Sequence, residues 1–192
     1  AYEKELSETN ALISEQFEGA KLPQLSMHVS GFRENVIILN GIISISTDKY
    51  LGENYNEYKN FFQPYERQRM QPKFIVRDYV KAWLMSDIIK NGTEENESLS
   101  SSIIYDGKVL YALSALLPQQ KQEDIIGYTE NQWNWCKNNE SDVWKKIVKQ
   151  NYLFSTDHML ITRLINEAPY SAPISNDSPG RLGSWIGWQI VN

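Results

Sequence analysis

Histidine and cysteine are nearly absent from this chain. Its 192 residues contain two histidines, His28 and His158, and one cysteine, Cys136. A single cysteine excludes an internal disulfide, which fits a reducing compartment and equally an envelope protein without bridges. Two histidines so far apart in the sequence do not form the paired imidazoles of a histidine-based zinc hydrolase. We interpret each as a surface or hydrogen-bonded residue, and we expect no metal and no cofactor.

Long apolar runs and clustered basic residues are also missing. No stretch approaches the roughly 20 apolar residues of a membrane-spanning helix, and residues 2–6 are charged helix formers rather than an apolar signal region. Lys and Arg are scattered and the net charge is −5, so we expect no nucleic-acid partner. Because the sequence stops inside an apolar helical pattern at residues 185–191, we expect the chain to be clipped at both ends, with any export signal upstream.

Hydrophobic residues, in contrast, are plentiful. They make up 41% of the chain, and aromatic residues make up 12%. This composition excludes a disordered chain, because apolar burial can offset the entropy lost on ordering. The length fits one domain over residues 1–192. The residue pattern predicts an α+β, mostly helical fold, with a helix over 2–17, a small N-terminal sheet and then about six helices.

The strands are predicted within residues 25–47, where alternating and β-branched residues are dense. Asn40-Gly41 interrupts this run, and it fits either a hairpin turn or a glycine bulge in one long strand. Asn91-Gly92 is expected to end the second of the later helices, and Thr129 with Gln132 has the form of a capping box. The helices are predicted at 54–63, 73–90, 98–117, 129–149 and 156–167, with a last one opened by Ser178-Pro179.

The helix predicted at 73–90 is apolar on every side, which is typical of a helix buried in a core. It nevertheless carries Arg77, Asp78 and Lys81, and Asp106 falls inside the apolar stripe of the next helix. Charges on buried faces need partners, because an unpaired charge is strongly destabilising. We therefore predict an internal ionic cluster in which Arg77 pairs with Asp106 and Asp78 neighbours Lys81. In the alternative, Arg77 and Lys81 extend their charged ends to water.

Several segments resemble the gliding-motility lipoprotein family usually called GldB, and the wider predicted zinc-protease superfamily around it. They occur in order over residues 48–191. The resemblance implies a zincin-like fold, with a small twisted sheet, an active-site helix behind it and further helices, in a lipoprotein of the cell envelope. The segments are DKYLG at 48–52, PKFIVRD at 72–78, YDGKVLY at 105–111, GYT at 127–129, NQWNWC at 131–136 and SPGRLGSWIGWQIV at 178–191.

In active zincins an H-E-x-x-H motif places two zinc-binding imidazoles one helical turn apart, with a glutamate as general base. If the helix at 73–90 is its counterpart, Arg77, Asp78 and Lys81 stand at the positions of the first His, the Glu and the second His. Positive charges there repel a zinc ion. Relatives often have a glutamate where this chain has Asp106, before Gly107. The resemblance thus implies a degenerate active site in which Arg77 and Lys81 hold the carboxylates.

Other features have a structural and a functional interpretation. Gly180, Gly183 and Gly187 lie close to one face of the last helix, where small residues let another helix approach; alternatively, the start of this helix with Arg181 holds an anion. Cys136 has no histidine motif nearby, which favours an inert thiol. The tryptophans are interpreted as packing residues, with a carbohydrate or peptide groove as the alternative; they are Trp133, Trp135, Trp144, Trp185 and Trp188.

These observations together predict a non-catalytic, zincin-like envelope lipoprotein linked to gliding motility or surface secretion. We expect it to bind a protein or peptide partner and to meet the membrane only through an upstream lipid anchor. The alternative is a metal-dependent peptidase or other hydrolase that uses carboxylates such as Asp78 and Asp106. Arg77 and Lys81 in the same cluster argue against this alternative.

Overall fold

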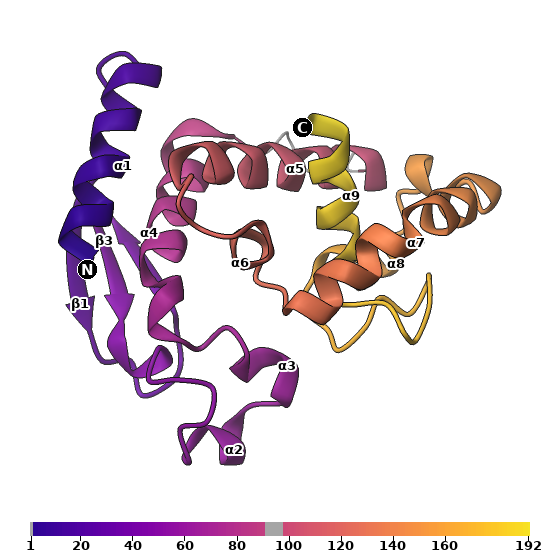
Figure 1. The fold of residues 1–192 in the computed structure, drawn as a ribbon, viewed down its shortest axis with the longest axis horizontal. Coiled ribbons are helices and arrows are strands. Elements are labelled where there is room, and N and C mark those ends of the chain that lie inside the picture. The colour runs from indigo at the N-terminus through magenta and orange to yellow at the C-terminus, as the bar shows by residue number, and fades with distance from the viewer. Residues whose placement is uncertain (1, 91–97) are drawn as a thin grey trace. The chain divides into compact units, whose positions relative to one another are not determined.

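The computed structural model describes residues 2–90 and 98–192 (Figure 1). The chain forms two compact units, the first from residues Ala1–Lys90 and Ala112–Lys121, and the second from residues Asn91–Tyr111 and Gln122–Asn192. Helix α5 (Leu99–Leu116) contributes to both. The single domain expected over residues 1–192 therefore stays a prediction.

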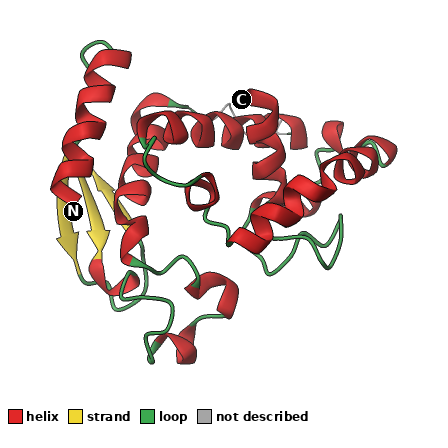
Figure 2. Ribbon diagram, in the orientation of Figure 1, coloured by secondary structure: helices red, strands yellow, loops and turns green. Residues whose placement is uncertain are grey.

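A three-stranded sheet belongs to the first unit (Figure 2). Its strands β1 (Gln24–His28), β3 (Ile42–Ser46) and β2 (Val36–Leu39) lie in that order, with β3 parallel to β1 and antiparallel to β2. Leu39 pairs with Ile42 across Asn40-Gly41, and Gly41 has a φ of +73°, which favours glycine. The hairpin turn is thus confirmed, and the single bulged strand is wrong.

Helix α4 (Ile75–Trp83) packs against this sheet. A 3-10 turn, η2 (Pro72–Phe74), leads into it, and a π-helical turn, η3 (Leu84–Ile88), follows it. Ile43 and Ile45 of β3 are fully buried, and most residues of α4 are buried. The prediction of a buried helix is therefore confirmed for α4, whereas residues 85–87, in the second half of the predicted helix, are exposed. The π-helical turn was not predicted, and the expected end at Asn91-Gly92 lies outside the described residues.

Helix α1 (Tyr2–Gln16) adds to the core of the first unit. Phe17, just after α1, meets Trp83 edge to face, with 6.0 Å between ring centroids. The helix predicted at 54–63 is instead two single turns, α2 (Tyr58–Phe61) and α3 (Pro64–Arg67). Phe62 and Gln63 between them are extended, because the residue before a proline is pushed out of the helical region.

The second unit is helical. Besides part of α5 it contains α6 (Gln122–Ile126), α7 (Glu130–Lys149), the 3-10 turn η5 (Tyr152–Phe154), α8 (His158–Ile165) and α9 (Leu182–Val191). The amide of Gln132 donates to the Thr129 hydroxyl, and the Thr129 amide donates to the Gln132 side chain, which confirms the predicted capping box. The short helix α6 was not predicted.

Glycines bring two helices of this unit into backbone contact. A Cβ at Gly187 of α9 would overlap the carbonyl oxygen of Ile103 in α5, and a Cβ at Gly107 would overlap the carbonyl oxygen of Gly187. A Cβ at Gly183 would come within 3.0 Å of the Leu164 carbonyl oxygen. The predicted packing role of the glycines in the last helix is confirmed.

The prediction that Ser178-Pro179 opens the last helix is wrong. Helix α9 begins at Leu182, after Arg181 in the left-handed conformation with φ +58°. The Ser178 hydroxyl instead accepts from the Ser171 amide at 3.2 Å, and the Ser171 hydroxyl accepts from the Leu182 amide at 3.1 Å. Hydrogen bonds within a folded loop therefore place the helix start later than the Ser-Pro signal indicated.

Helices dominate the described residues, and the sheet is small. The α+β, mostly helical fold is confirmed. Among the helices of residues 2–90 and 98–192, none is both long and apolar enough to cross a bilayer.

Candidate functional site

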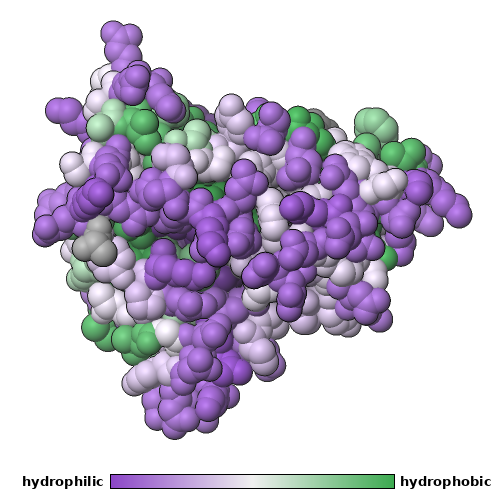
Figure 3. Space-filling model, in the orientation of Figure 1, coloured by the Kyte–Doolittle hydropathy of each residue, from purple (hydrophilic) through white to green (hydrophobic). Residues whose placement is uncertain are grey.

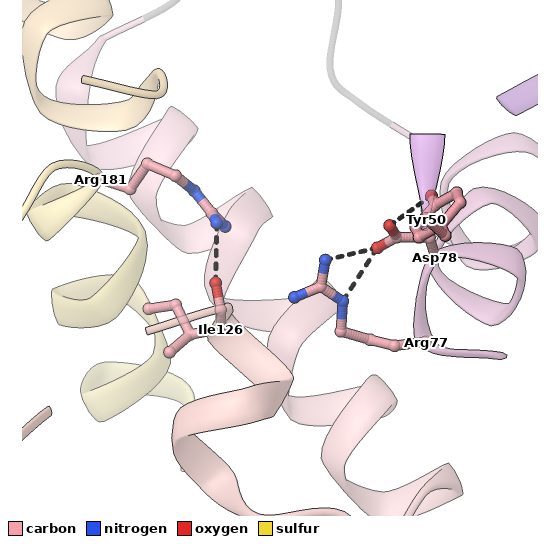
Figure 4. Close-up of polar contacts among 5 residues, drawn as sticks. All are labelled: Tyr50, Arg77, Asp78, Ile126 and Arg181. Atoms are coloured by element: carbon pink, nitrogen blue, oxygen red, sulfur yellow. Dashed lines mark hydrogen bonds and ion pairs between the residues drawn. The ribbon is translucent and has the colours of Figure 1, made fainter. Parts of the chain in front are cut away.

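Two adjacent residues of α4 form a buried ion pair (Figure 4). Nε and Nη2 of Arg77 both donate to Oδ1 of Asp78, at 2.9 and 2.6 Å. The other carboxylate oxygen, Oδ2, accepts from the Tyr50 hydroxyl at 2.7 Å. The side chains of Arg77 and Asp78 are only 5% and 13% exposed. A helix and the segment after β3 thus bring a guanidinium, a carboxylate and a phenol together away from water.

The surroundings of Asp78 keep its carboxylate ionised. Burial alone raises the pKa of Asp78, but the charge of Arg77, the hydrogen bonds from Tyr50 and Arg77, and the charge of Lys81 together hold it below its usual value. Burial and the negative charge of Asp78 raise the pKa of Tyr50, so the phenol keeps its proton. Neither group therefore exchanges a proton near neutral pH.

The aromatic ring of Phe74 supports the cluster from the start of the helix. The guanidinium carbon of Arg77 lies 4.3 Å from the ring centroid, and Nζ of Lys73 lies 4.8 Å from it. Planar guanidinium groups stack well on aromatic faces. Arg77 is therefore held inside the protein and does not extend to water, while Lys81 is half-buried.

Asp106 lies in the second unit and has its own partner there. The Ser184 hydroxyl, from α9, donates to Oδ2 of Asp106. Ser184 is fully buried, and Asp106 is half-buried. This bond joins α5 to α9 beside the contact between Gly107 and Gly187. The pairing of Asp106 with Arg77 stays a prediction, because these two residues belong to separate units.

Arg181 also makes a contact within the second unit. Its Nη1 donates to the carbonyl oxygen of Ile126 at 2.7 Å (Figure 4). The first amide of α9, that of Leu182, is capped by the Ser171 hydroxyl. An anion contact at Arg181 stays a prediction, and the local structure supplies protein partners at this helix start.

A second carboxylate centre, which the sequence did not single out, lies just after β3. Asp48 accepts from the amides of Ser30 and Phe32, at 3.1 and 2.8 Å, and from the Ser46 hydroxyl. Burial raises the pKa of Asp48, but these hydrogen bonds outweigh it and lower the pKa to about 2. Phe32 has a φ of +67°, an unfavourable conformation for a bulky residue. Ser30-Gly31 indicates a turn in the sequence, but not that its amides meet Asp48.

Each histidine has its own local surroundings. Nδ1 of His28 lies 2.8 Å from the Ser44 hydroxyl, and His158 is exposed at the start of α8, so both interpretations from the sequence are confirmed. In the described part of the chain, no group of three or more His, Cys, Asp or Glu side chains could hold a metal ion. The cluster on α4 does not suit zinc either, because Asp78 is engaged by Arg77 and Tyr50.

The thiol and the tryptophans have structural surroundings. Burial raises the pKa of Cys136 to about 12, although a hydrogen bond with the Tyr128 side chain opposes this, which favours an inert thiol. Trp185 and Trp188 are buried, and Trp133 packs on Trp188 with 5.7 Å between centroids. The two buried rings support the packing interpretation, since they cannot line an open groove.

Similarity to known proteins places the chain in a family. A family profile described as gliding motility protein GldB matches residues 1–192, the whole sequence given. No curated protein and no solved structure matches the chain. The profile match agrees with the resemblance carried by residues 48–191, and it extends that resemblance to the N-terminal helix and sheet. The chain therefore belongs to the GldB family of gliding motility proteins.

Proposed function

We propose that this protein is a non-catalytic, zincin-like binding protein of the cell envelope that serves a gliding-motility or surface-secretion machinery. Membership of a gliding-motility lipoprotein family indicates an envelope protein. The proposal depends mainly on one observation, the buried guanidinium of Arg77 bound to Asp78.

The position of this ion pair supports a degenerate metal site. Helix α4 packs on the sheet, as expected for the active-site helix of a zincin-like fold. If α4 is that helix, Arg77 takes the position of the first zinc-binding imidazole. A metal ion there would have to displace Arg77 from a buried carboxylate. Breaking a buried ion pair costs about 3–5 kcal/mol, so the pair competes strongly with a metal.

The charge state of Asp78 argues against the alternative hydrolase. A general base works best when its pKa lies near the working pH. The pKa of Asp78 is held below its usual value, since Arg77 and Tyr50 outweigh the effect of burial, so this carboxylate is a weak base near neutral pH. Both of its oxygens also accept hydrogen bonds from the protein.

Binding of a protein or peptide partner is supported by exposed apolar residues of the first unit. Leu51, Tyr55 and Phe61 lie along the segment after β3, and all three are exposed. Exposed apolar groups of this kind are typical of interaction surfaces. We propose that the buried ion pair stabilises the packing of the first unit and that exposed apolar residues such as these contact the partner.

Metal content and peptidase activity test the non-catalytic role. We expect the purified chain to contain far less than stoichiometric zinc and to show no chelator-sensitive cleavage of casein, an unstructured substrate. Stoichiometric zinc, or cleavage that a chelator abolishes, would refute the proposal and favour the hydrolase.

A pair of histidine substitutions tests the zincin-like geometry separately. The double variant Arg77→His with Lys81→His should bind Co²⁺ with the intense visible absorption of a tetrahedral site. The matched control is Lys145→His with Lys149→His, which has the same spacing on α7 at exposed positions. If the α4 variant binds Co²⁺ no more tightly than the α7 control, the zincin-like assignment of α4 is wrong.

A further inference from the structure

Strand β1 forms one edge of the sheet in the first unit. The strand order is β1-β3-β2, so among residues 2–90 and 98–192 only β3 pairs with β1, on one side of it. Figures 1 and 2 show β1 at the left of the view, on the outer side of the sheet. Charged residues and prolines commonly protect natural edge strands from pairing with other chains. β1 contains neither, so its outer edge is open to pairing.

The backbone hydrogen bonds show which groups of β1 face outward. The Gln24 amide donates to the Gly41 carbonyl oxygen at 3.0 Å, and the His28 carbonyl oxygen accepts from the Thr47 hydroxyl at 3.1 Å. Gln24 and His28 therefore direct these groups toward β3 and the residue that follows it. Alternate residues of a paired strand direct their N–H and C=O groups to opposite edges. Leu25 and Met27 thus present their N–H and C=O groups at the outer edge.

One face of this edge is apolar. Leu25 and Met27 pair with Ile43 and Ile45 of β3, and directly paired residues lie on the same face of a sheet. Ile43 and Ile45 are fully buried, whereas Leu25 is half-buried and Met27 is 46% exposed. Figure 3 shows green, hydrophobic residues among purple ones at the left-hand side of the view, where Figure 1 draws the sheet. The apolar face therefore extends to the edge and is not fully covered there.

The opposite face of the same edge is polar. Ser26 pairs with Ser44 and His28 pairs with Ser46, and Nδ1 of His28 lies 2.8 Å from the Ser44 hydroxyl. A strand added beside β1 continues both faces of the sheet, so its side chains must alternate between apolar and polar. β2, the other edge of the sheet, is apolar at all four positions, and its sequence does not impose this alternation.

We propose that a partner protein adds an extended segment, with alternating apolar and polar side chains, to the outer edge of β1. The outward N–H and C=O groups of Leu25 and Met27 select an extended chain, because a helix uses its own backbone groups internally. The apolar side chains of the segment cover Met27 and extend the face that α4 packs against on β3. Strand addition to a sheet edge is a common mode of peptide recognition. This proposal rests on the proposed binding role and specifies the form of the partner segment.

Hydrogen exchange followed by NMR tests the proposal on the 192-residue chain. The probe is a synthetic peptide in which Val and Thr alternate, with a Lys at each end for solubility. The control peptide has the same composition, with its Val and Thr residues in separate blocks. Without peptide, the amides of Leu25 and Met27 should exchange faster than the Ser26 amide, which faces β3. With the alternating peptide at about ten times its Kd, exchange at Leu25 and Met27 should slow by about tenfold, because exchange then requires the free state. The control peptide should have no such effect.

Two proline variants at opposite edges make the test specific. Met27→Pro removes an outward N–H and no hydrogen bond to β3, a change that edge strands tolerate. It should weaken binding of the alternating peptide by about tenfold or more. The matched control is Ile38→Pro on β2. The Ser46 amide donates to the Asn35 carbonyl oxygen, so the antiparallel pattern also directs the Ile38 amide outward, and Ile38 is similarly exposed, at 51%. Ile38→Pro should leave peptide binding unchanged.

Three results would overturn the proposal. The first is unchanged exchange of the Leu25 and Met27 amides with millimolar alternating peptide, a measurement on the unmodified chain that does not depend on how the variants fold. The second is an equal loss of peptide binding in Met27→Pro and Ile38→Pro, both checked for folding by circular dichroism. The third is self-association in analytical ultracentrifugation that Met27→Pro abolishes, which would show that the edge pairs with a second copy of the chain. None of these results bears on zinc content or peptidase activity, so this proposal and the non-catalytic role fail separately.

Discussion

Removing the charge of Arg77 is expected to destabilise the protein strongly. In Arg77→Met, the aliphatic stem remains beside Phe74, but the buried carboxylate of Asp78 loses the guanidinium that donates to Oδ1 at 2.6 and 2.9 Å. Leaving one member of a buried ion pair without its partner costs about 3–5 kcal/mol. We expect the free energy of unfolding at pH 7, measured by urea denaturation, to fall by about this amount.

A double-mutant cycle separates the loss of the pair from the loss of packing. Adding Asp78→Asn to Arg77→Met removes the uncompensated charge, so the double variant should recover much of the lost stability. Replacing both members of a buried pair by neutral groups is often close to neutral. The coupling between the two substitutions should therefore be about 1 kcal/mol or larger.

The pH dependence of the free energy of unfolding gives a second, independent test of the ion pair. The folded pKa of Asp78 is lowered from the ordinary value of 3.8, because Arg77 and Tyr50 outweigh burial. The stabilising effect of this carboxylate is therefore present above the ordinary pKa and is lost as pH falls through the folded pKa. In Arg77→Met burial dominates and raises the folded pKa. The destabilisation caused by the buried Asp78 carboxylate without its partner is then present at neutral pH and disappears below about pH 4. The stability difference between the two proteins should thus shrink in acid.

Two results would refute this reasoning. The first is an Arg77→Met variant within about 1 kcal/mol of the wild type at pH 7, and the second is a difference that does not change with pH. The same variant also tests the predicted pairing with Asp106. If Arg77→Met and Asp106→Asn add within about 0.5 kcal/mol, the two residues do not interact, whereas strong coupling would support the pairing.

Other substitutions probe the helix contact and the loop after β1. Gly187→Ala should lower the free energy of unfolding by about 3 kcal/mol or more, because its Cβ overlaps the Ile103 carbonyl oxygen. Gly183→Ala, whose nearest contact is 3.0 Å, is the milder control, and equal losses would contradict the close helix crossing. Asp48→Asn should cost about 1–2 kcal/mol at pH 7 in urea denaturation, since Asp48 is partly exposed. Its folded pKa is about 2, below the ordinary value of 3.8, because hydrogen bonds from Ser46 and loop amides outweigh burial. The loss should therefore fade as pH falls from about 4 to 2, and a pH-independent loss would show that the carboxylate charge is not what holds the loop.

Local signals predicted the elements well where local chemistry decides them. Thr129 and Gln132 form the expected capping box, since both partners lie within one helical turn. The all-round apolar pattern of residues 73–90 predicted a buried helix, and α4 within it is buried. Sequence signals failed where residues distant in the sequence compete for the same hydrogen-bonding groups. The Ser178 hydroxyl binds the Ser171 amide rather than capping a helix at Pro179.

The sequence by itself determined the mostly helical composition, the buried helix with charges on it, and the absence of an H-E-x-x-H motif. Periodicity and residue counts are properties of the chain alone, so no tertiary structure is needed for these conclusions. Only the folded structure decided which partner each charge has. Arg77 lies beside Asp78 in sequence, but Tyr50 reaches that carboxylate from 28 positions away. Asp48 meets amides 16 and 18 positions away. Such pairings depend on how strands and helices pack, because a buried charge takes whichever donor the packed core brings within hydrogen-bonding distance.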